Sequence, residues 1–311
     1  MTPPRVAHPP ARHAPPLAST TLLRDVVILG AIWGASVVAQ RMAVAEVSPL
    51  ALVVLRFCAG LLFFLPFLPR VRRGLIASRR RFVDVGLVGS LNPFATGVLS
   101  ALALLYASSG LVAVLISLAP LLTALLATVV LREPIPSRAR LAGLAAAFGG
   151  VAVLIVTRST GLEGSATGDL RGHALALAVA LLMAVSTVYA RMRLGGTDPL
   201  AMAAGQIVGA MLFALPAMLL AGEAIAPTEI SARAWVAIVA SGAIGLGASF
   251  VLFMGMIERH GPTASLLALY VMPVAAAALG ALLLDEAITP AMAGGAALVL
   301  LGVVLFTRRT H

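Results

Sequence analysis

Long apolar runs separated by short polar connections dominate the chain. The run at 110–133, GLVAVLISLAPLLTALLATVVLRE, is apolar for more than twenty residues and has one proline near its middle. A helix needs about 20 residues, at 1.5 Å each, to cross the roughly 30 Å hydrocarbon core of a bilayer. The run therefore predicts a membrane-spanning helix that ends at Glu133.

Ten runs of this kind follow one another along the chain. They lie near 25–43, 49–69, 82–106, 110–131, 138–157, 172–192, 199–220, 234–257, 263–284 and 289–307. Glycine and proline occur inside them, which membrane helices tolerate where neighbouring helices satisfy the freed backbone groups. The pattern predicts an all-α membrane protein with ten transmembrane helices.

The second half of the chain repeats the pattern of the first at an offset of 150–153 residues. Corresponding positions are Pro120 and Pro273, Glu133 and Glu286, and Arg56 and Gln206. Each half holds five runs, an odd number, so the second half is expected to enter the membrane in the opposite direction. We therefore expect two inverted five-helix repeats, 22–158 and 172–308, joined by a linker at 159–171. Such repeats usually enclose a central cavity near the bilayer midplane.

The ends of the runs predict the orientation in the membrane. Residues 1–21 are rich in proline and contain no apolar run, which predicts a disordered tail. All 22 basic residues are arginine, and alternating runs would place seventeen of them on the side of the tail and four on the other. The positive-inside rule then puts both termini in the cytoplasm. We expect an integral protein of the cell (inner) membrane.

Composition narrows the class of protein. Hydrophobic residues make up 60% of the chain and charged residues 11%, against about 45–50% and 25% in soluble domains. The net charge of +10 fits arginines facing anionic lipid better than nucleic acid. The chain has no lysine for a phosphate loop, and Cys58 is its only cysteine. We expect a small-molecule substrate and membrane lipid as partners, no nucleic acid, no cofactor or metal, and a monomer.

Polar side chains inside the apolar runs are the candidate substrate contacts. The predicted cavity lining is Trp33, Ser36, Asn92, Thr96, Ser186, Tyr189, Ser249 and Tyr270. The alternative for each residue is a hydrogen bond between helices, which is common in membrane bundles. As a set they favour a cavity, because polar groups facing lipid without partners are costly.

Three charged residues at or inside the runs are candidates for gating. Arg56 lies about eight residues into its run, where an arginine costs at least about 2.5 kcal/mol and needs a partner or water. It could anchor a substrate carboxylate, form a gating ion pair, or serve a structural role. Glu133 and Glu286 could each bond the start of the following helix, or pair with an arginine as a gate. Gln206, neutral at the position that corresponds to Arg56, favours packing there.

These residues resemble a known family. Trp33-Gly34-Ala35-Ser36, Arg56-Phe57 and the blocks Pro120…Glu133 and Pro273…Glu286, with ten runs in two halves, are similar to the EamA family of the drug/metabolite transporter superfamily. The resemblance covers about 22–307. It implies a basket of ten helices around a central cavity, and transport of small metabolites, amino acids among them. Gln206 departs from the symmetric pattern.

Two other classes of function compete with transport. An intramembrane enzyme is possible in principle, since Ser36 and Ser249 each end a Gly-Ala-Ser triplet, but no histidine lies mid-run to act as base. A structural membrane protein is disfavoured by the polar set inside the runs. We therefore expect a secondary transporter that works by alternating access, with export of amphipathic metabolites such as amino acids. The absence of acidic residues at the centres of the runs favours facilitated or weakly coupled transport.

Overall fold

The computed structural model describes residues 20–75, 79–132, 137–157, 161–162, 170–194, 197–260, 265 and 267–307, and the regular structure in these ranges is entirely helical. The first half contains α1 Thr20–Ala43, α2 Pro49–Phe64, α3 Leu68–Leu75, α4 Arg79–Gly89, α5 Thr96–Tyr106, α6 Ser109–Ile116, α7 Ala119–Val130 and α8 Arg138–Val156. The second half contains α9 Arg171–Arg193, α10 Pro199–Leu220, α11 Ala232–Val239, α12 Ser249–His260, α14 Ala268–Leu284 and α15 Pro290–Thr307. A 3₁₀ turn, η1 Leu65–Phe67, and two π-helical segments, η2 Ser90–Ala95 and η3 Ala240–Ala248, join neighbouring helices.

Seven of the described helical segments are long and apolar enough to cross a membrane, some of them after joining across a kink. They are Thr20–Ala43, Pro49–Arg73, Arg80–Tyr106, Ser109–Val130, Arg171–Arg193, Pro199–Leu220 and Ala232–Phe253. The shorter apolar helices are Leu141–Val156, Ala268–Leu284 and Pro290–Leu305. Every run predicted from the sequence overlaps one of these segments, so the helical class is as predicted.

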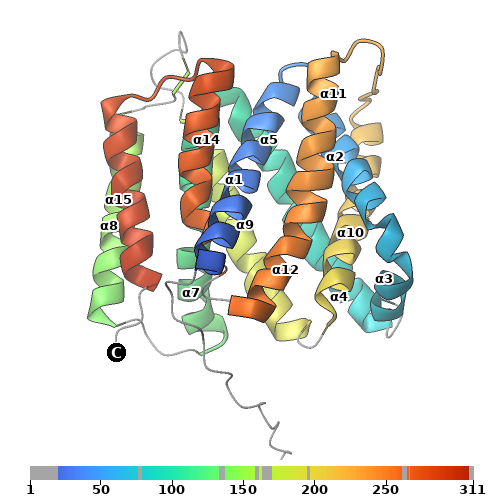
Figure 1. Cartoon of the computed structure of the whole chain (residues 1–311), viewed down its shortest axis with the longest axis horizontal. Helices are drawn as coiled ribbons and strands as arrows, with labels where there is room; N and C mark the ends of the chain where they lie inside the picture. Colours follow the sequence, from blue (N-terminus) through green and yellow to red (C-terminus); the bar gives the residue numbers. More distant parts are fainter. Residues whose placement is uncertain are drawn as a thin grey trace, which may run out of the picture.

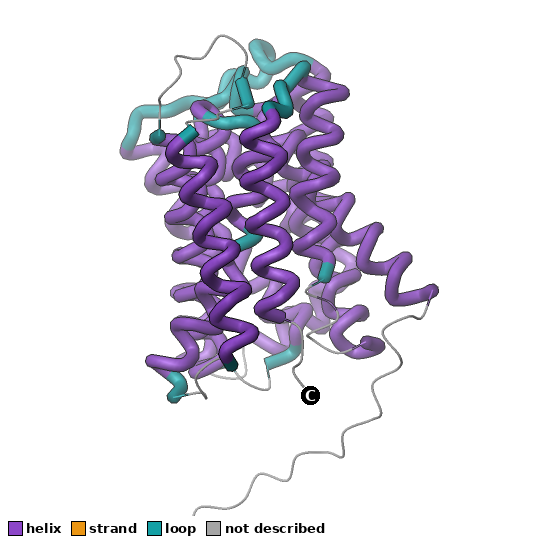
Figure 2. Tube along the Cα trace, turned by 90° about the vertical axis from the view of Figure 1, so that its left-hand side faces the viewer, coloured by secondary structure: helices purple, strands orange, loops and turns teal. Residues whose placement is uncertain are grey.

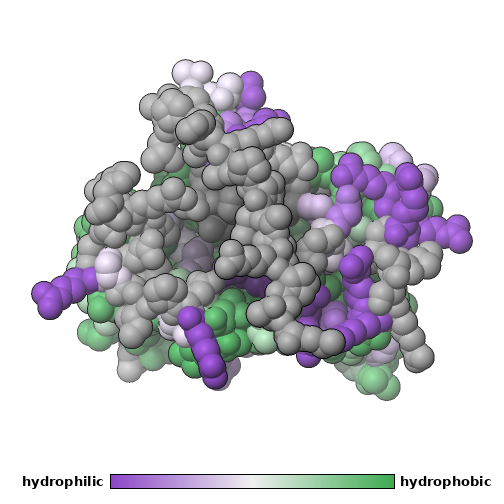
Figure 3. All heavy atoms as spheres, turned by 90° about the horizontal axis from the view of Figure 1, so that it is seen from below, coloured by the Kyte–Doolittle hydropathy of each residue, from purple (hydrophilic) through white to green (hydrophobic). Residues whose placement is uncertain are grey.

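The helices stand side by side, and their connections gather at two ends (Figures 1 and 2). We call the end that holds residues 44–48 and 221–231 the upper end, and the opposite end, where α1 begins and α15 ends, the lower end. In Figure 1, α1 runs from the lower to the upper end, whereas α9, its counterpart in the second half, runs from the upper to the lower end. Seen from below, hydrophilic side chains project around the lower end and hydrophobic ones appear at the rim (Figure 3).

Glycine lets helices of the two halves approach closely, as expected where packing rather than water drives association. A Cβ on Gly34 of α1 would lie 2.7 Å from the carbonyl oxygen of Met272 in α14. A Cβ on Gly150 of α8 would lie 2.6 Å from the carbonyl oxygen of Gly295 in α15. The first contact holds α1 against α14, and the second holds α8 against α15.

Both halves depart from regular helix in the same part of the repeat. In η2, Asn92 has non-helical φ and ψ of −144° and 113°, directly before Pro93, which has no N–H to donate. In the second half, the glycine-rich segment η3 is also π-helical. Segments of this kind widen a helix and are frequent at functional sites.

The two repeats differ at their paired prolines. Pro120 lies in the first turn of α7, after a break at residues 117–118, where the missing N–H costs nothing. Pro273 lies inside α14. Corresponding residues thus share a place in the repeat but differ in local geometry. Gln206 lies within α10 and is half-buried.

Candidate functional site

A cavity of about 230 Å³ lies between helices of both halves. Its polar lining comes from α1, α2, η2 and α5, and apolar residues of α6, α9, η3 and α14 complete it. The polar and aromatic residues that line it are Trp33, Ser36, Gln40, Arg56, Asn92, Thr96 and Ser100. Both segments that depart from regular α-helix, η2 and η3, therefore form part of the cavity wall.

Arg56 is the charged residue of this cavity. The residue is 5% exposed. Its Nη1 donates to Oε1 of Gln40 at 2.7 Å, and its Nε donates to Oγ of Ser241 at 3.1 Å. Gln40 in turn donates from Nε2 to the carbonyl oxygen of Ser36 at 3.0 Å, and Ser241 donates to that of Ile238 at 3.1 Å. A relay of neutral groups from α1 and the α11–η3 segment thus holds the guanidinium in place.

The guanidinium of Arg56 keeps hydrogen-bonding capacity in reserve. It has five N–H groups, and the two bonds above are the only ones that it makes to described residues, which leaves three. Within the described part of the chain, no carboxylate pairs with it. A buried arginine without an acidic partner is well suited to receive an anionic group from a ligand.

The part of the lining that comes from η2 and α5 offers neutral polar groups one helical turn apart. Thr96 donates from Oγ1 to Oδ1 of Asn92 at 2.9 Å. Ser100, one turn further along α5, lines the same cavity. The NH₂ group of Asn92 makes no hydrogen bond to described residues. It remains available to a ligand.

Four of the predicted lining residues lie outside this cavity. Ser249 donates to the carbonyl oxygen of Gly245 at 2.8 Å, and Tyr270 lies 3.4 Å from that of Val303. Tyr189 donates to Oδ1 of Asp84 at 2.7 Å. Ser186 is 1% exposed and also does not line the cavity. In this conformation the hydroxyl groups of Ser249, Tyr270 and Tyr189 serve bonds within or between helices, which was the alternative considered for each.

The sequence reading left out three residues that the structure brings to Arg56 or to its cavity. Gln40 and Ser100 follow Ser36 and Thr96 at i+4, so helical periodicity groups them with the polar residues of the runs, although the predicted lining did not name them. Ser241 had no comparable signal, because it lies 185 residues from Arg56 along the chain. Its role follows only from the packing of α2 against η3.

Glu286 does not bond the start of the following helix, α15, so that expectation is wrong. Its carboxylate accepts from the backbone N–H of Ser109 at 2.9 and 3.0 Å and from the Ser109 hydroxyl at 2.6 Å, at the first residue of α6. The reason is the left-handed conformation of Asp285, with φ 52°, which turns the chain back after α14. Arg41 lies at 4.0 Å from Glu286, in the arrangement considered for a gate. Glu133 lies outside the described residues.

At the lower end, a buried carboxylate joins the two halves. Asp25 of α1 is 3.0 Å from Arg24, 3.0 Å from Arg259 and 3.4 Å from His260 of α12. The side chains of Asp25 and His260 are 5% and 6% exposed. Higher on the same helices, Trp33 packs against Phe253 at 5.6 Å between ring centroids. Thus α1 and α12 connect the cavity wall to the lower end.

At the upper end, Glu46 joins the α1–α2 connection to the start of α11. The backbone N–H of Ser231, at 2.8 Å, and its hydroxyl, at 2.7 Å, donate to the carboxylate. These bonds to Ser231, the backbone one first, hold the pKa of the Glu46 carboxyl below its usual value. Both ends of the molecule therefore carry polar ties between the halves.

The fold and the site define a membrane protein of two repeated helical halves that enclose a cavity with a buried arginine. The chain belongs to the EamA-like transporter family, whose model matches residues 26–156 and 170–308. This confirms the resemblance seen in the sequence. The chain is 25% identical over 283 residues to an uncharacterized transporter from Archaeoglobus fulgidus, covering 89% of this chain and 95% of that protein. A solved crystal structure matches with a TM-score of 0.63 at 22% identity, covering 90% of this chain and 94% of that chain, and shares the fold. The class of protein is thus a membrane transporter.

Proposed function

We propose that this membrane transporter is a secondary transporter of small metabolites that carry a carboxylate group, with amino acids as the first candidates. The observation that carries the proposal is Arg56, a buried cation that faces the cavity with hydrogen-bond donors to spare. A substrate carboxylate would supply the missing counter-charge and acceptors. Burying the arginine without such a ligand is costly, so its position favours a functional role over a purely structural one.

The size and the remaining lining of the cavity fit the same kind of cargo. At about 230 Å³ it is smaller than the roughly 300–1,000 Å³ of pockets for drug-sized ligands. Trp33 supplies an apolar face, and Asn92 supplies an amide to the same cavity as Arg56. A zwitterion with a modest side chain would therefore place its carboxylate on Arg56 and its other groups on η2 and α5.

The proposed mechanism is alternating access of an inverted-repeat protein. In this proposal the protein has ten transmembrane helices, and both termini and the lower end lie in the cytoplasm. The opposite directions of α1 and α9 support the inverted arrangement, and the excess of arginine in the lower connections supports the orientation. The ties at Asp25 and Glu46 join the two halves at opposite ends. Opening either end would break the tie there, while the cavity stays between the halves.

The decisive experiment is flux through purified protein in liposomes without nucleotide. Labelled amino acids should enter or leave faster than in protein-free liposomes, and the corresponding amino acid amides should be transported poorly. If a broad panel of carboxylate compounds moves no faster than in protein-free liposomes, the proposal is wrong. Export as the net direction would be tested by comparing preloaded with empty vesicles.

The orientation has its own test. Reporter fusions after residues 75 and 162 should place the first in the cytoplasm and the second outside. A cytoplasmic reporter at both positions would contradict the proposed topology, whatever the substrate proves to be.

A further inference from the structure

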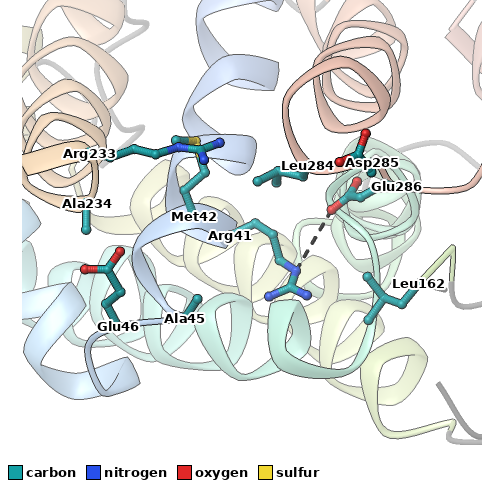
Figure 4. A pocket seen from close by; sticks show the side chains of 10 residues that line it. All are labelled: Arg41, Met42, Ala45, Glu46, Leu162, Arg233, Ala234, Leu284, Asp285 and Glu286. Carbon is teal, nitrogen blue, oxygen red and sulfur yellow. Dashed lines mark ion pairs between the residues drawn. The ribbon is translucent and has the colours of Figure 1, made fainter. Parts of the chain in front are cut away.

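A second and larger pocket, of about 690 Å³, lies at the upper end between the end of α1, the start of α11 and the end of α14 (Figure 4). It is separate from the inner cavity, although both touch α1: Gln40 lines the inner cavity and Arg41 lines this pocket. Half of its ten lining residues are charged. These are Arg41, Glu46, Arg233, Asp285 and Glu286.

The protein itself satisfies two of the three lining carboxylates. Glu46 accepts from the N–H and hydroxyl of Ser231 at the start of α11. Glu286 accepts from the N–H and hydroxyl of Ser109 at the start of α6. Both lie at helix N-termini, where free N–H groups and the helix dipole favour negative charge. These carboxylates are therefore poor partners for an incoming cation.

The two arginines, Arg41 and Arg233, use less of their hydrogen-bonding capacity. Arg233 donates from Nη2 to the carbonyl oxygen of Leu283 at 2.9 Å. Arg41 approaches Glu286 only to 4.0 Å and makes no hydrogen bond to the described residues. Figure 4 shows Arg233 extending from α11 toward α1, and Arg41 extending from α1 toward Glu286. With five N–H groups on each guanidinium, the unused capacity of the pocket is mainly that of cationic donors.

We propose that this pocket binds the carboxylate group of a small molecule through Arg41 and Arg233. Guanidinium groups match carboxylates in geometry and form charge-assisted bonds with them. The side chain of Asp285, exposed and without an ion pair or hydrogen bond to the described residues, disfavours ligands that carry several negative charges. The ligand class is thus a monocarboxylate or a zwitterion. Binding of the carboxylate in this pocket does not depend on the proposed function. The role of the pocket as a waiting position on the transport path does rest on that function.

Thiol protection can test the site directly. Cys58, the only cysteine, is replaced by serine, and Met42→Cys places a thiol in the pocket wall. A neutral maleimide is applied to the full-length protein at constant ionic strength, with leucine or leucinamide as the probe. Leucine should slow labelling in a saturable way, and leucinamide should not. Arg41→Gln and Arg233→Gln should each raise the half-protecting concentration by roughly ten-fold or more, whereas Arg171→Gln, outside the pocket, should leave it unchanged.

The matched reporter for the inner cavity is Met183→Cys. Protection at Met183 but not at Met42 would overturn the outer site and leave the transporter proposal intact. Protection at Met42 alone would support the outer site and count against the inner cavity. Equal protection by leucine and leucinamide, or protection by inorganic phosphate but not by leucine, would also overturn the carboxylate assignment. Ala45→Cys, in the same wall, replaces Met42→Cys if that variant does not fold.

Discussion

Arg56→Gln should abolish the preference of the protein for carboxylate substrates. Glutamine keeps a polar side chain beside Gln40 and Ser241 but removes the charge and the forked donors of the guanidinium. Three N–H groups of Arg56 remain for a ligand once its two bonds are counted. A hydrogen bond to a charged group contributes about 1.5–3 kcal/mol, which corresponds to roughly ten- to a hundred-fold in affinity. The apparent affinity for an amino acid should therefore fall by at least roughly ten-fold.

The assay compares an amino acid with its amide in liposomes that contain wild-type or Arg56→Gln protein. The amide lacks the carboxylate, so it should lose little affinity in the variant. The ratio of apparent affinities, acid over amide, should be high in the wild type and approach one in Arg56→Gln. Because both affinities are measured with the same protein preparation, their ratio is not affected by errors in the amount of active protein. Arg56→Lys, which keeps the charge without the fork, should give an intermediate ratio.

Protein stability provides the control. Arg56→Gln removes a bonding partner of Gln40 and Ser241, but it also removes a buried cation, so the two effects on the free energy of unfolding oppose each other. The thermal midpoint should change little. Arg72→Gln, on the exposed surface of α3, should change neither the midpoint nor the affinity ratio. If folded Arg56→Gln protein kept the wild-type ratio, Arg56 would not be the carboxylate anchor.

Further predictions address packing and the two ends. Gly34→Ala should destabilise the protein by about 1–3 kcal/mol in thermal unfolding, because the new Cβ would overlap α14. Gly86→Ala is the control and should cost no stability, since no heavy atom lies within 4 Å of its new Cβ. Equal losses in the two variants would contradict the packing. Asp25→Asn should lower stability by about 1 kcal/mol, since the arginines that it releases can turn to solvent, and wild-type stability would argue against a tie there. The pKa of Glu46 is lowered in the folded protein. The bonds from Ser231 therefore stabilise the fold at pH values above the ordinary pKa of glutamate, near 4.3. This contribution is lost as the pH falls through the lowered pKa of the folded state. The stability difference between wild type and Glu46→Gln should therefore shrink on acidification, and a constant difference would be evidence against the bond.

Short-range patterns in the sequence determined where the helices lie. Apolar runs of sufficient length predicted the place of each long apolar helix, because a helix is the local way to satisfy backbone groups in lipid. Helix N-caps also depend on local sequence. Ser48 and Asp198 each precede a proline, and their side chains accept hydrogen bonds from the N–H groups of Ala51 and Ala201 at the starts of α2 and α10. The repeat and the family resemblance depended on the same kind of linear pattern.

The tertiary structure alone decided which faces of the helices meet. In a soluble helix the apolar face marks the core, but here lipid and core are both apolar, so the pattern does not reveal how each helix is rotated about its axis. Arg56 and Ser241 are 185 residues apart, and Ser109 and Glu286 are 177 apart. Tyr189 faces Asp84 instead of the cavity for the same reason. These pairings follow from close glycine contacts and from the turn at Asp285, which only the folded chain brings together.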